Sequence, residues 1–452
     1  MSHQRSTTGQ QTERLVDHVA SLRFEDIPPD VVQAAKNTIV DGVAACAFGF
    51  GFPWSQAVVA YAEKMGGTGG RCTVLGAGAA RFHPPFAALI NGALAHSFEL
   101  DGGTRKGVGA HPFGTVFTAA LPVAQQVGAS GRDLITAFVA GSEALLRIGK
   151  ATGRSNEHRG FHAPGTTGPF GAAIACSLLQ SASREQVLNA VGIAGSLCSG
   201  LRQFAKSKTG GMVKRLHFGR AAEAGVLAAG LAQEGFDGPH DILEGRVGFL
   251  RVFCDSYDLD ELVRGLDRET FHMREISMKY FATHGSTQAP LKALLQILDT
   301  HGLAKGDIAE VVVTASRESV ENHNGAAPAD LMQAQYSIPF CIALACVRDI
   351  RDPRAMSEDA LGDAAIHAML ARVRVEIGDF DEKRTCHVKV RSVDGREYEL
   401  LSVDDARTWR PASVEDVTEK YTILMRDVPQ AGALLARLQT LETQADLDWL
   451  RL

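Results

Sequence analysis

The chain has 452 residues, of which 45% are hydrophobic and 22% charged. This is the composition of a globular protein, and the length suits two or three domains. Its 46 Lys and Arg residues against 52 Asp and Glu give a formal net charge of −6. That balance argues against a nucleic-acid-binding protein, which would favour a basic surface.

The cysteines and the apolar runs predict where the protein works. The eight cysteines are scattered and form no C-x-x-C pair, which indicates a reducing compartment rather than a disulfide framework. The N-terminal residues are polar and lack the apolar stretch of a signal peptide. No run approaches the roughly 18–20 apolar residues of a membrane helix. We therefore expect a cytoplasmic protein with no membrane partner.

Residues 12 to about 264 carry a helical pattern with short breaks. Pro28-Pro29 and Pro84-Pro85 each open a helix, because proline is tolerated in a first helical turn. Further helical segments are predicted at 114–128, 131–150, 168–180, 184–203 and 215–234.

After about residue 265 the pattern changes to mixed strands and helices. The turn Asp394-Gly395 predicts a hairpin between the last two strands. The fold class predicted is mainly α: a large helical domain (1–265 plus 408–452) with a smaller α+β domain (266–407), and a ligand cleft is expected between them. Strands are predicted at 308–316, 373–379, 386–393 and 396–403, and helices at 337–347, 363–373 and 413–452.

The run from Lys214 to Phe249 combines a basic cluster with a helix of small residues. Lys214, Arg215 and His217 open the helix, and Lys206 and Lys208 precede them. Small residues then recur on one helical face, which lets another backbone come close. The cluster predicts a carboxylate or phosphate ligand, although a charge run is more commonly a solvated face. The small residues are Ala221, Gly225, Ala228 and Ala232.

Four further polar positions surround a glycine-rich segment. His96 and Glu99 are three apart near a helix end and are expected to share a face. Asp101 follows, and His111 comes after a loop that contains Arg105 and Lys106. The functional interpretation is a carboxylate and an imidazole that flank a substrate-gating loop. The structural alternative is a helix C-cap at Gly102-Gly103 followed by a solvated loop.

Two more histidines lie in unusual contexts. His162 precedes a Gly/Thr-rich turn and a helix start, where backbone N–H groups favour an anion. The alternative is a tight loop with a hydrogen-bonded histidine. Lys279 and His284 stand five apart at the start of the second domain, from which they are expected to project into the cleft.

A metal site is the rival interpretation. Its candidate ligands are His96, Glu99, Asp101, His111 and His162. The sequence has no H-E-x-x-H motif and no cysteine pair, and three Lys/Arg clusters predict an anionic substrate more directly than a cation. We therefore predict no metal site. A Rossmann motif and a G-x-S-x-G nucleophile elbow are also missing from the sequence.

An ordered set of blocks resembles the MmgE/PrpD family over nearly the whole chain. The blocks are NGALAHSFELD (91–101), His111-Pro112, GSEALLRIG (141–149), GFHAPGTTGPFGAA (160–173), KRLHFGRAAEAG (214–225), GFDGPHDILEGRVGF (235–249), MKYFATHG (278–285) and AQYSIPFCIALA (334–345). The resemblance implies a large helical domain with a smaller α+β lid domain, usually as a homodimer.

Members of the family include 2-methylcitrate dehydratase, cis-aconitate decarboxylase and iminodisuccinate epimerase. The resemblance implies cofactor-independent proton transfer at a carbon beside a carboxylate of a small di- or tricarboxylic acid. We predict a lyase of the dehydratase type, with a decarboxylase or an epimerase (isomerase) as alternatives. A carboxylate-binding protein without catalysis and a metal hydrolase are the alternatives from other classes.

The resemblance also implies roles for individual residues. Lys214, Lys279 and Arg215 would bind carboxylates and stabilise enolate-like charge. His111 and His162 would be the acid–base pair, and Glu99 and Asp101 would orient a histidine or contact the substrate. The remaining predicted site residues are His284, which would line the cleft from the lid domain, and His96, Lys208 and Phe340, which would bind substrate.

Three departures from the family pattern weaken the match to a methylcitrate dehydratase. The family often reads D-x-D-D where this chain has Glu99-Leu100-Asp101-Gly102. It often has tyrosine where this chain has Phe340 and Ser142, and phenylalanine where it has Tyr336. The loss of one aspartate and of a tyrosine hydroxyl leaves room for a decarboxylase, an epimerase or a hydratase of another acid.

Overall fold

The computed structural model describes residues 10–104, 109–207, 209–267, 269–380, 385–403 and 411–451. The predicted site residue Lys208, and Arg105 and Lys106 of the predicted gating loop, lie outside these ranges. The chain forms two compact units. The first comprises residues 1–97, 101–278 and 411–452, and the second comprises 98–100 and 279–410. The predicted class, mainly α with a smaller α+β part, is confirmed.

The first unit is built on α10 (Val213–Gln233), which packs against α8 (Ala163–Leu179), α4 (Pro84–Ala95) and α9 (Arg184–Ser196). The prolines open helices as predicted, at Pro29 and Pro84. The other helices of this unit are α1 (Gln11–Ala20), α2 (Pro29–Gly49), α3 (Pro53–Lys64), α5 (Thr118–Val127), α6 (Gly131–Thr152), α7 (Ser155–His158), α11 (Phe249–Phe253), α17 (Val414–Leu424) and α18 (Ala431–Gln439).

Small residues let α10 approach its neighbours closely, as the sequence predicts. A Cβ at Gly219 would overlap the carbonyl oxygen of Leu89 in α4, and one at Gly225 would overlap Ala172 in α8. Ala221, Gly225, Ala228 and Ala232 are all buried. Among the glycines of α10, Gly219, which lies outside the predicted set, comes closest to the backbone of another element.

Several local predictions need correction. A short hairpin of β1 (Thr68–Thr73) and β2 (Arg81–Phe82) interrupts the region predicted as helical. The helix expected at 114–128 begins as a π-turn (Phe113–Phe117) and continues as α5. The Gly/Thr-rich turn expected after His162 is itself helical, because α8 starts at Ala163 with Pro164 in its first turn, where proline fits.

The first unit continues to Met278, whereas the sequence pattern placed the change at 265. Two interactions keep the intervening segment with the helices. The Glu143 carboxylate in α6 accepts hydrogen bonds from the backbone N–H groups of His272 (3.0 Å) and Met273 (2.8 Å). In addition, β4 (Ile276–Ser277) pairs with β3 (Gly103–Thr104). The apolar pattern gives no sign of either contact.

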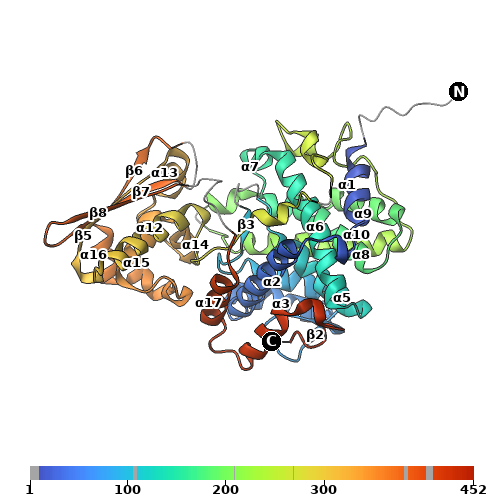
Figure 1. Cartoon of the computed structure of the whole chain (residues 1–452), viewed down its shortest axis with the longest axis horizontal. Helices are drawn as coiled ribbons and strands as arrows, with labels where there is room; N and C mark the ends of the chain where they lie inside the picture. The colour runs from blue at the N-terminus through green and yellow to red at the C-terminus, as the bar shows by residue number, and fades with distance from the viewer. Residues whose placement is uncertain are drawn as a thin grey trace. The chain divides into compact units, whose positions relative to one another are not determined.

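The second unit contains a sheet of four strands, which Figure 1 labels β5 to β8. Their order in the sheet is β6-β5-β7-β8. Alternate residues of β5 and β7 are buried, because one face of the sheet is covered by α12 (Gly285–His301). The predicted hairpin turn is present, and Gly395 has a φ of 86°. The strands are β5 (Ile308–Ser316), β6 (Val373–Gly378), β7 (Cys386–Ser392) and β8 (Glu397–Ser402).

Strand β6 runs parallel to β5, so a crossover joins them. The crossover is helical and contains α13 (Arg317–His323), α14 (Leu331–Tyr336), α15 (Ile338–Val347) and α16 (Ala364–Leu370). The sequence predicts two of these helices, α15 and α16. Helices α13 and α14, of seven and six residues, were not predicted.

The C-terminal segment returns to the first unit. Helix α17 packs against α2, where Lys420 forms a buried ion pair with Asp41 at 2.6 Å. Lys36 of α2 donates to the carbonyl of Gln439 (3.0 Å) and to Glu442 (2.9 Å). The last segment therefore completes the core of the first unit.

Within the described ranges, no helix is by itself long and apolar enough to cross a membrane. Taken together, α2 and α3 meet the length and composition criterion, but they are bent by 88° relative to each other.

Candidate active site

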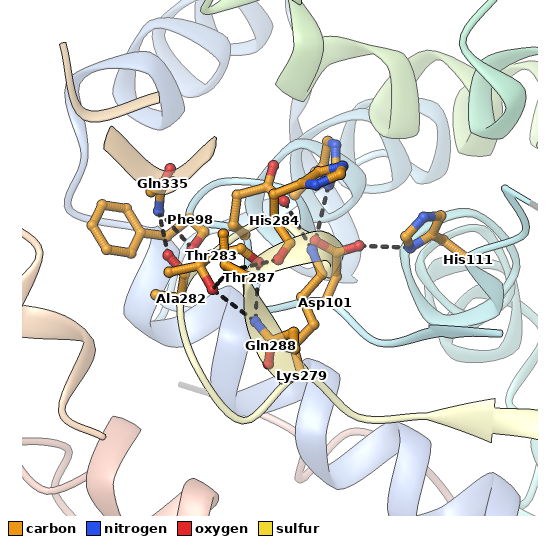
Figure 2. Close-up of polar contacts among 12 residues, drawn as sticks. Phe98, Asp101, His111, Lys279, Ala282, Thr283, His284, Thr287, Gln288 and Gln335 are labelled. Atoms are coloured by element: carbon orange, nitrogen blue, oxygen red, sulfur yellow. Dashed lines mark hydrogen bonds and ion pairs between the residues drawn. The ribbon is translucent and has the colours of Figure 1, made fainter. Parts of the chain in front are cut away.

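One carboxylate joins two imidazoles in the turn that follows α4. Asp101 places one oxygen 2.9 Å from His96 Nδ1 and the other 2.7 Å from His111 Nδ1, and Figure 2 marks the contact between Asp101 and His111. The carbonyl oxygen of Gly102 also lies 2.9 Å from His111 Nδ1. Because all these partners are acceptors, each imidazole in its neutral form carries its proton on Nδ1 and presents a lone pair at Nε2.

The exposure of the two histidines differs. His96 and Asp101 are buried, whereas 20% of the His111 side chain is exposed. The Nε2 atom of His96 has no hydrogen-bond partner among the described residues, and its ring stacks on Phe218 with centroids 3.8 Å apart. His111 is therefore the member of this pair that an external molecule reaches first.

The backbone after His111 has an uncommon conformation. The π-turn Phe113–Phe117 follows directly, and π-turns are frequent at functional sites. Gly42 of α2 leaves room for the ring of Phe113, and Gly114 leaves room for Phe218. The turn is thus packed against two other helices, which fixes the position of His111.

A second pair of histidines lies near His96. His162 directly precedes α8, and His217 lies in the second turn of α10. Their Nδ1 atoms are 2.9 Å apart. The rings of His96 and His162 have centroids 5.8 Å apart. The first unit therefore gathers four histidines from segments that are far apart in the sequence.

Burial keeps three of these histidines neutral. It lowers the pKa of His96 well below the ordinary value, helped by the positive charge of Lys214 and only partly opposed by Asp101. Burial likewise lowers the pKa of His162 well below the ordinary value, with His96 and His217 adding to the effect. For His217, burial and then Lys214 lower the pKa to about 4. Neutral imidazoles accept protons or donate hydrogen bonds.

The two cations at the start of α10 differ in their surroundings. Lys214 is buried, and its charge acts on both His96 and His217. Arg215 donates from Nε to the carbonyl of Ser97 (3.1 Å) and from Nη1 to that of Gly211 (3.0 Å). Its guanidinium also lies over the Trp54 ring. These contacts tie the Arg215 guanidinium to other groups of the first unit.

Within the parts of the chain that the structure describes, no group of three or more His, Cys, Asp or Glu side chains is arranged to hold a metal ion.

Comparison with known proteins gives the family. The model of the MmgE/PrpD N-terminal domain matches residues 13–262, and the model of the MmgE/PrpD C-terminal domain matches residues 281–441. The first match alone covers more than half of the chain. The chain belongs to the MmgE/PrpD family.

Several curated proteins that are similar in sequence to this chain are named cis-aconitate decarboxylases. One from Aspergillus terreus is 32% identical over 296 aligned positions, and the match covers 63% of this chain and 59% of that protein. The one from Homo sapiens is 26% identical over 428 residues, 91% of this chain and 86% of that protein. The one from Mus musculus is 26% identical over 459 residues, 95% and 91% respectively. The match to the fungal protein spans under two thirds of that protein's length.

The second unit of this MmgE/PrpD chain holds the other predicted site residues. Lys279 Nζ lies 2.8 Å from Glu99 Oε2. Glu99 does not share a helical face with His96 as predicted, because α4 ends at Ala95 and Glu99 has a φ of 57° in the left-handed region. For the same reason Gly102 and Gly103 do not cap that helix.

His284 is the N-cap residue of α12, and its ring packs at a tilt against two rings that were not predicted to belong to the site. The centroid distances are 4.2 Å to His323 and 4.5 Å to Tyr336. Next to them, the Gln335 amide donates to the carbonyls of Phe98 (3.1 Å) and Ala282 (3.0 Å), as Figure 2 shows. No local spacing in the sequence links His323 to His284.

Phe340 was expected to bind substrate, but its side chain is 0% exposed in the core of the second unit. Helix α15 is buried along nearly its whole length, and it is apolar on all sides. His217 was noticed as part of the basic cluster but was not assigned to the site. Its position three residues after Lys214, on the same helical face, was the available signal.

Proposed function

We propose that this protein is a lyase that acts on a small di- or tricarboxylic acid by proton transfer at a carbon beside a carboxylate. The observation that carries the proposal is the Asp101 carboxylate, which holds His96 and His111 with their Nε2 lone pairs available. The carboxylate–imidazole arrangement is a common way to orient a general base. Membership of the MmgE/PrpD family supports the same class of reaction.

The charge around the histidines suits this chemistry. Removing a proton beside a carboxylate places negative charge on the substrate, and a preorganised cation stabilises that charge. Lys214 is the candidate for this cation, since its positive charge lowers the pKa of both His96 and His217. We assign to Lys214 the binding of a substrate carboxylate and to His111 the movement of the carbon-bound proton.

Decarboxylation is the first specific activity that we propose, because the relatives are named cis-aconitate decarboxylases. In this reaction the bond between carbon and the departing carboxylate breaks, and its electron pair passes into the remaining unsaturated acid. An imidazole then delivers a proton to carbon, and CO2 leaves. The substrate class is an unsaturated tricarboxylic acid.

Dehydration is the second candidate, and the neutral state of three buried histidines favours it. A neutral imidazole removes the proton beside the carboxylate, the C–O bond of the neighbouring carbon breaks, and the hydroxyl leaves as water after protonation by a second group. The same pair of groups acting on the two faces of one carbon would instead produce an epimerase.

Proton NMR in D2O tests these possibilities with purified protein and cis-aconitate, 2-methylcitrate, citrate and malate. Loss of CO2 from cis-aconitate supports the decarboxylase, and loss of water from a hydroxy acid supports the dehydratase. Deuterium exchange without elimination indicates an epimerase. No change in any acid would contradict the proposed substrate class.

A histidine variant connects the activity to the site. His111→Asn should lower turnover by about 10²–10⁴-fold, the size of one general acid–base contribution. The exposed His158 provides the matched control, because His158→Asn removes an imidazole from the surface. Equal turnover in the two variants would remove His111 from the mechanism.

A further inference from the structure

His162 and His217 face each other through like atoms, which limits where their protons lie. The two Nδ1 atoms are 2.9 Å apart, and both imidazoles are buried. A hydrogen bond between two Nδ1 atoms needs one donor and one acceptor. Since each neutral ring has one proton, the donor ring has a lone pair at Nε2 and the acceptor ring has its proton at Nε2.

The charges nearby decide which ring donates. Lys214 stands one helical turn before His217 and is the principal charge acting on that ring. An ammonium group disfavours the partial positive charge that a ring gains when it accepts a proton. Arg202 also acts on His162, but it is the weakest of the five influences on that ring. His217 is therefore the poorer acceptor and donates its Nδ1–H to His162.

We propose that His217 is a positioning residue that holds His162 in the Nε2–H tautomer, opposite to the Nδ1–H tautomer that Asp101 imposes on His111. The inference rests on the proposed function and deepens it, because it assigns the two acid–base roles. His111 presents a lone pair and acts as the base. His162 presents a proton and acts as the acid that protonates the carbon or the leaving hydroxyl.

The hydrogen bond also balances the proton that His162 gives away. When Nε2 of His162 releases its proton to the substrate, the shared proton moves from His217 Nδ1 to His162 Nδ1. His217 then takes a proton from water at its own Nε2. The hydroxide that remains combines with the CO2 released in decarboxylation, or is neutralised by the proton that His111 removed from the substrate in dehydration. One proton enters at His217 and one leaves at His162, so neither ring is left as an anion.

Nitrogen-15 NMR of histidine-labelled protein tests the assignment without any substrate. In a neutral imidazole the protonated and unprotonated nitrogens have well separated shifts, so each tautomer is read directly. We expect the proton on Nε2 of His162 and on Nδ1 of His111 at neutral pH. A proton on Nδ1 of His162 would overturn the proposal, whatever activity the protein has.

Variants of His217 test its role in positioning. His217→Phe removes the donor, so the Nε2–H tautomer of His162 should lose its dominance and kcat should fall about tenfold or more with little change in KM. His217→Asn places an amide N–H near the position of Nδ1 and should restore both. Phe204→Leu is the packing control, because Phe204 touches both rings without a hydrogen bond to either.

The outcomes separate the two proposals. If no acid is turned over but His162 carries its proton on Nε2 in wild type and loses it in His217→Phe, the proposed function fails and the positioning stands. If the wild-type protein is active and the tautomer is unchanged in folded His217→Phe, the positioning role is refuted. Circular dichroism establishes that each variant is folded.

Discussion

The guanidinium of Arg215 lies over the indole of Trp54, with Cζ 4.2 Å from the ring centroid. The same indole donates from Nε1 to Ser97 Oγ at 2.6 Å, and Arg215 donates to the Ser97 carbonyl. Ser97 follows His96 directly. Arg215 and Trp54 therefore hold the turn that carries His96, which gives Arg215 a structural role beside the basic cluster to which it belongs.

The first prediction concerns this brace. Arg215→Lys should lower the free energy of unfolding by about 2 kcal/mol, because lysine replaces neither the two directed hydrogen bonds nor the planar stacking. Urea unfolding measures the change. Lys214→Met is the neighbouring comparison and should mainly raise KM. Unchanged stability with a raised KM in Arg215→Lys would instead make Arg215 a substrate ligand.

The second prediction concerns Asp101. Asp101→Asn should lower kcat by about 10²–10⁴-fold, because the amide has one acceptor oxygen where the carboxylate serves two Nδ1–H groups. His96, which has no other acceptor at Nδ1 among the described contacts, should shift its proton to Nε2 in the nitrogen-15 spectrum. Asp255→Asn is the surface control, since that side chain is 77% exposed. Normal turnover in Asp101→Asn would contradict the orienting role.

The third prediction compares two glycines of α10. Gly219→Ala should destabilise the protein by about 1–3 kcal/mol, because the new methyl group meets the backbone of α4. Gly230→Ala has nothing within 4 Å of the added carbon and should stabilise the helix by up to about 1 kcal/mol. Thermal or urea unfolding gives both values. A similar effect of the two substitutions would mean that the close approach of α10 and α4 contributes little.

The fourth prediction concerns acid stability. The pKa of His217 falls from an ordinary 6.5 to about 4 on folding, so between these values the unfolded chain binds the proton and the folded protein does not. The contribution of the neutral His217 to the free energy of unfolding is fully present above about pH 6.5. It is lost as the pH falls toward 4, by up to about 1.4 kcal/mol per pH unit. His96 and His162 act in the same direction.

Unfolding free energies measured from pH 7 to pH 4 test this dependence. His217→Phe should have a shallower slope than wild type, because one of the neutral buried histidines is gone. Identical slopes in the two proteins would contradict the neutral state of His217.

The parts of the fold that could be predicted are those that local spacing determines. Strands β5 and β7 carry buried residues at alternate positions, and β6 and β8 largely alternate exposed and half-buried ones. The predicted bounds of all four strands differ from the structure by a residue or so. The proline pairs and the Asp394-Gly395 turn determine the backbone conformation of only the few residues next to them, so their effect can be read locally. In contrast, β1 is rich in glycine and has no alternating pattern, so the hairpin it forms with β2 was not foreseen.

The site was predictable as a set of residues rather than as a geometry. Imidazoles and carboxylates in glycine-rich segments marked His96, Asp101, His111 and His162, which the structure brings together. The hydrogen-bond partners of these residues were not predictable. The hydrogen bond between His162 and His217, for example, joins residues that are 55 apart in the chain. The pairing of Glu99 with Lys279 likewise depends on tertiary structure and on a left-handed backbone that glutamate rarely adopts.

The return of the chain at residue 411 has a consequence for the order in which the protein matures during synthesis. Residues 279–403 form their sheet and helices from one continuous stretch, apart from the short segment 98–100. The helical unit needs α17 and Lys420 to neutralise the buried Asp41 of α2. The histidines emerge early from the ribosome, yet the core that surrounds them is finished only by the last tenth of the polypeptide.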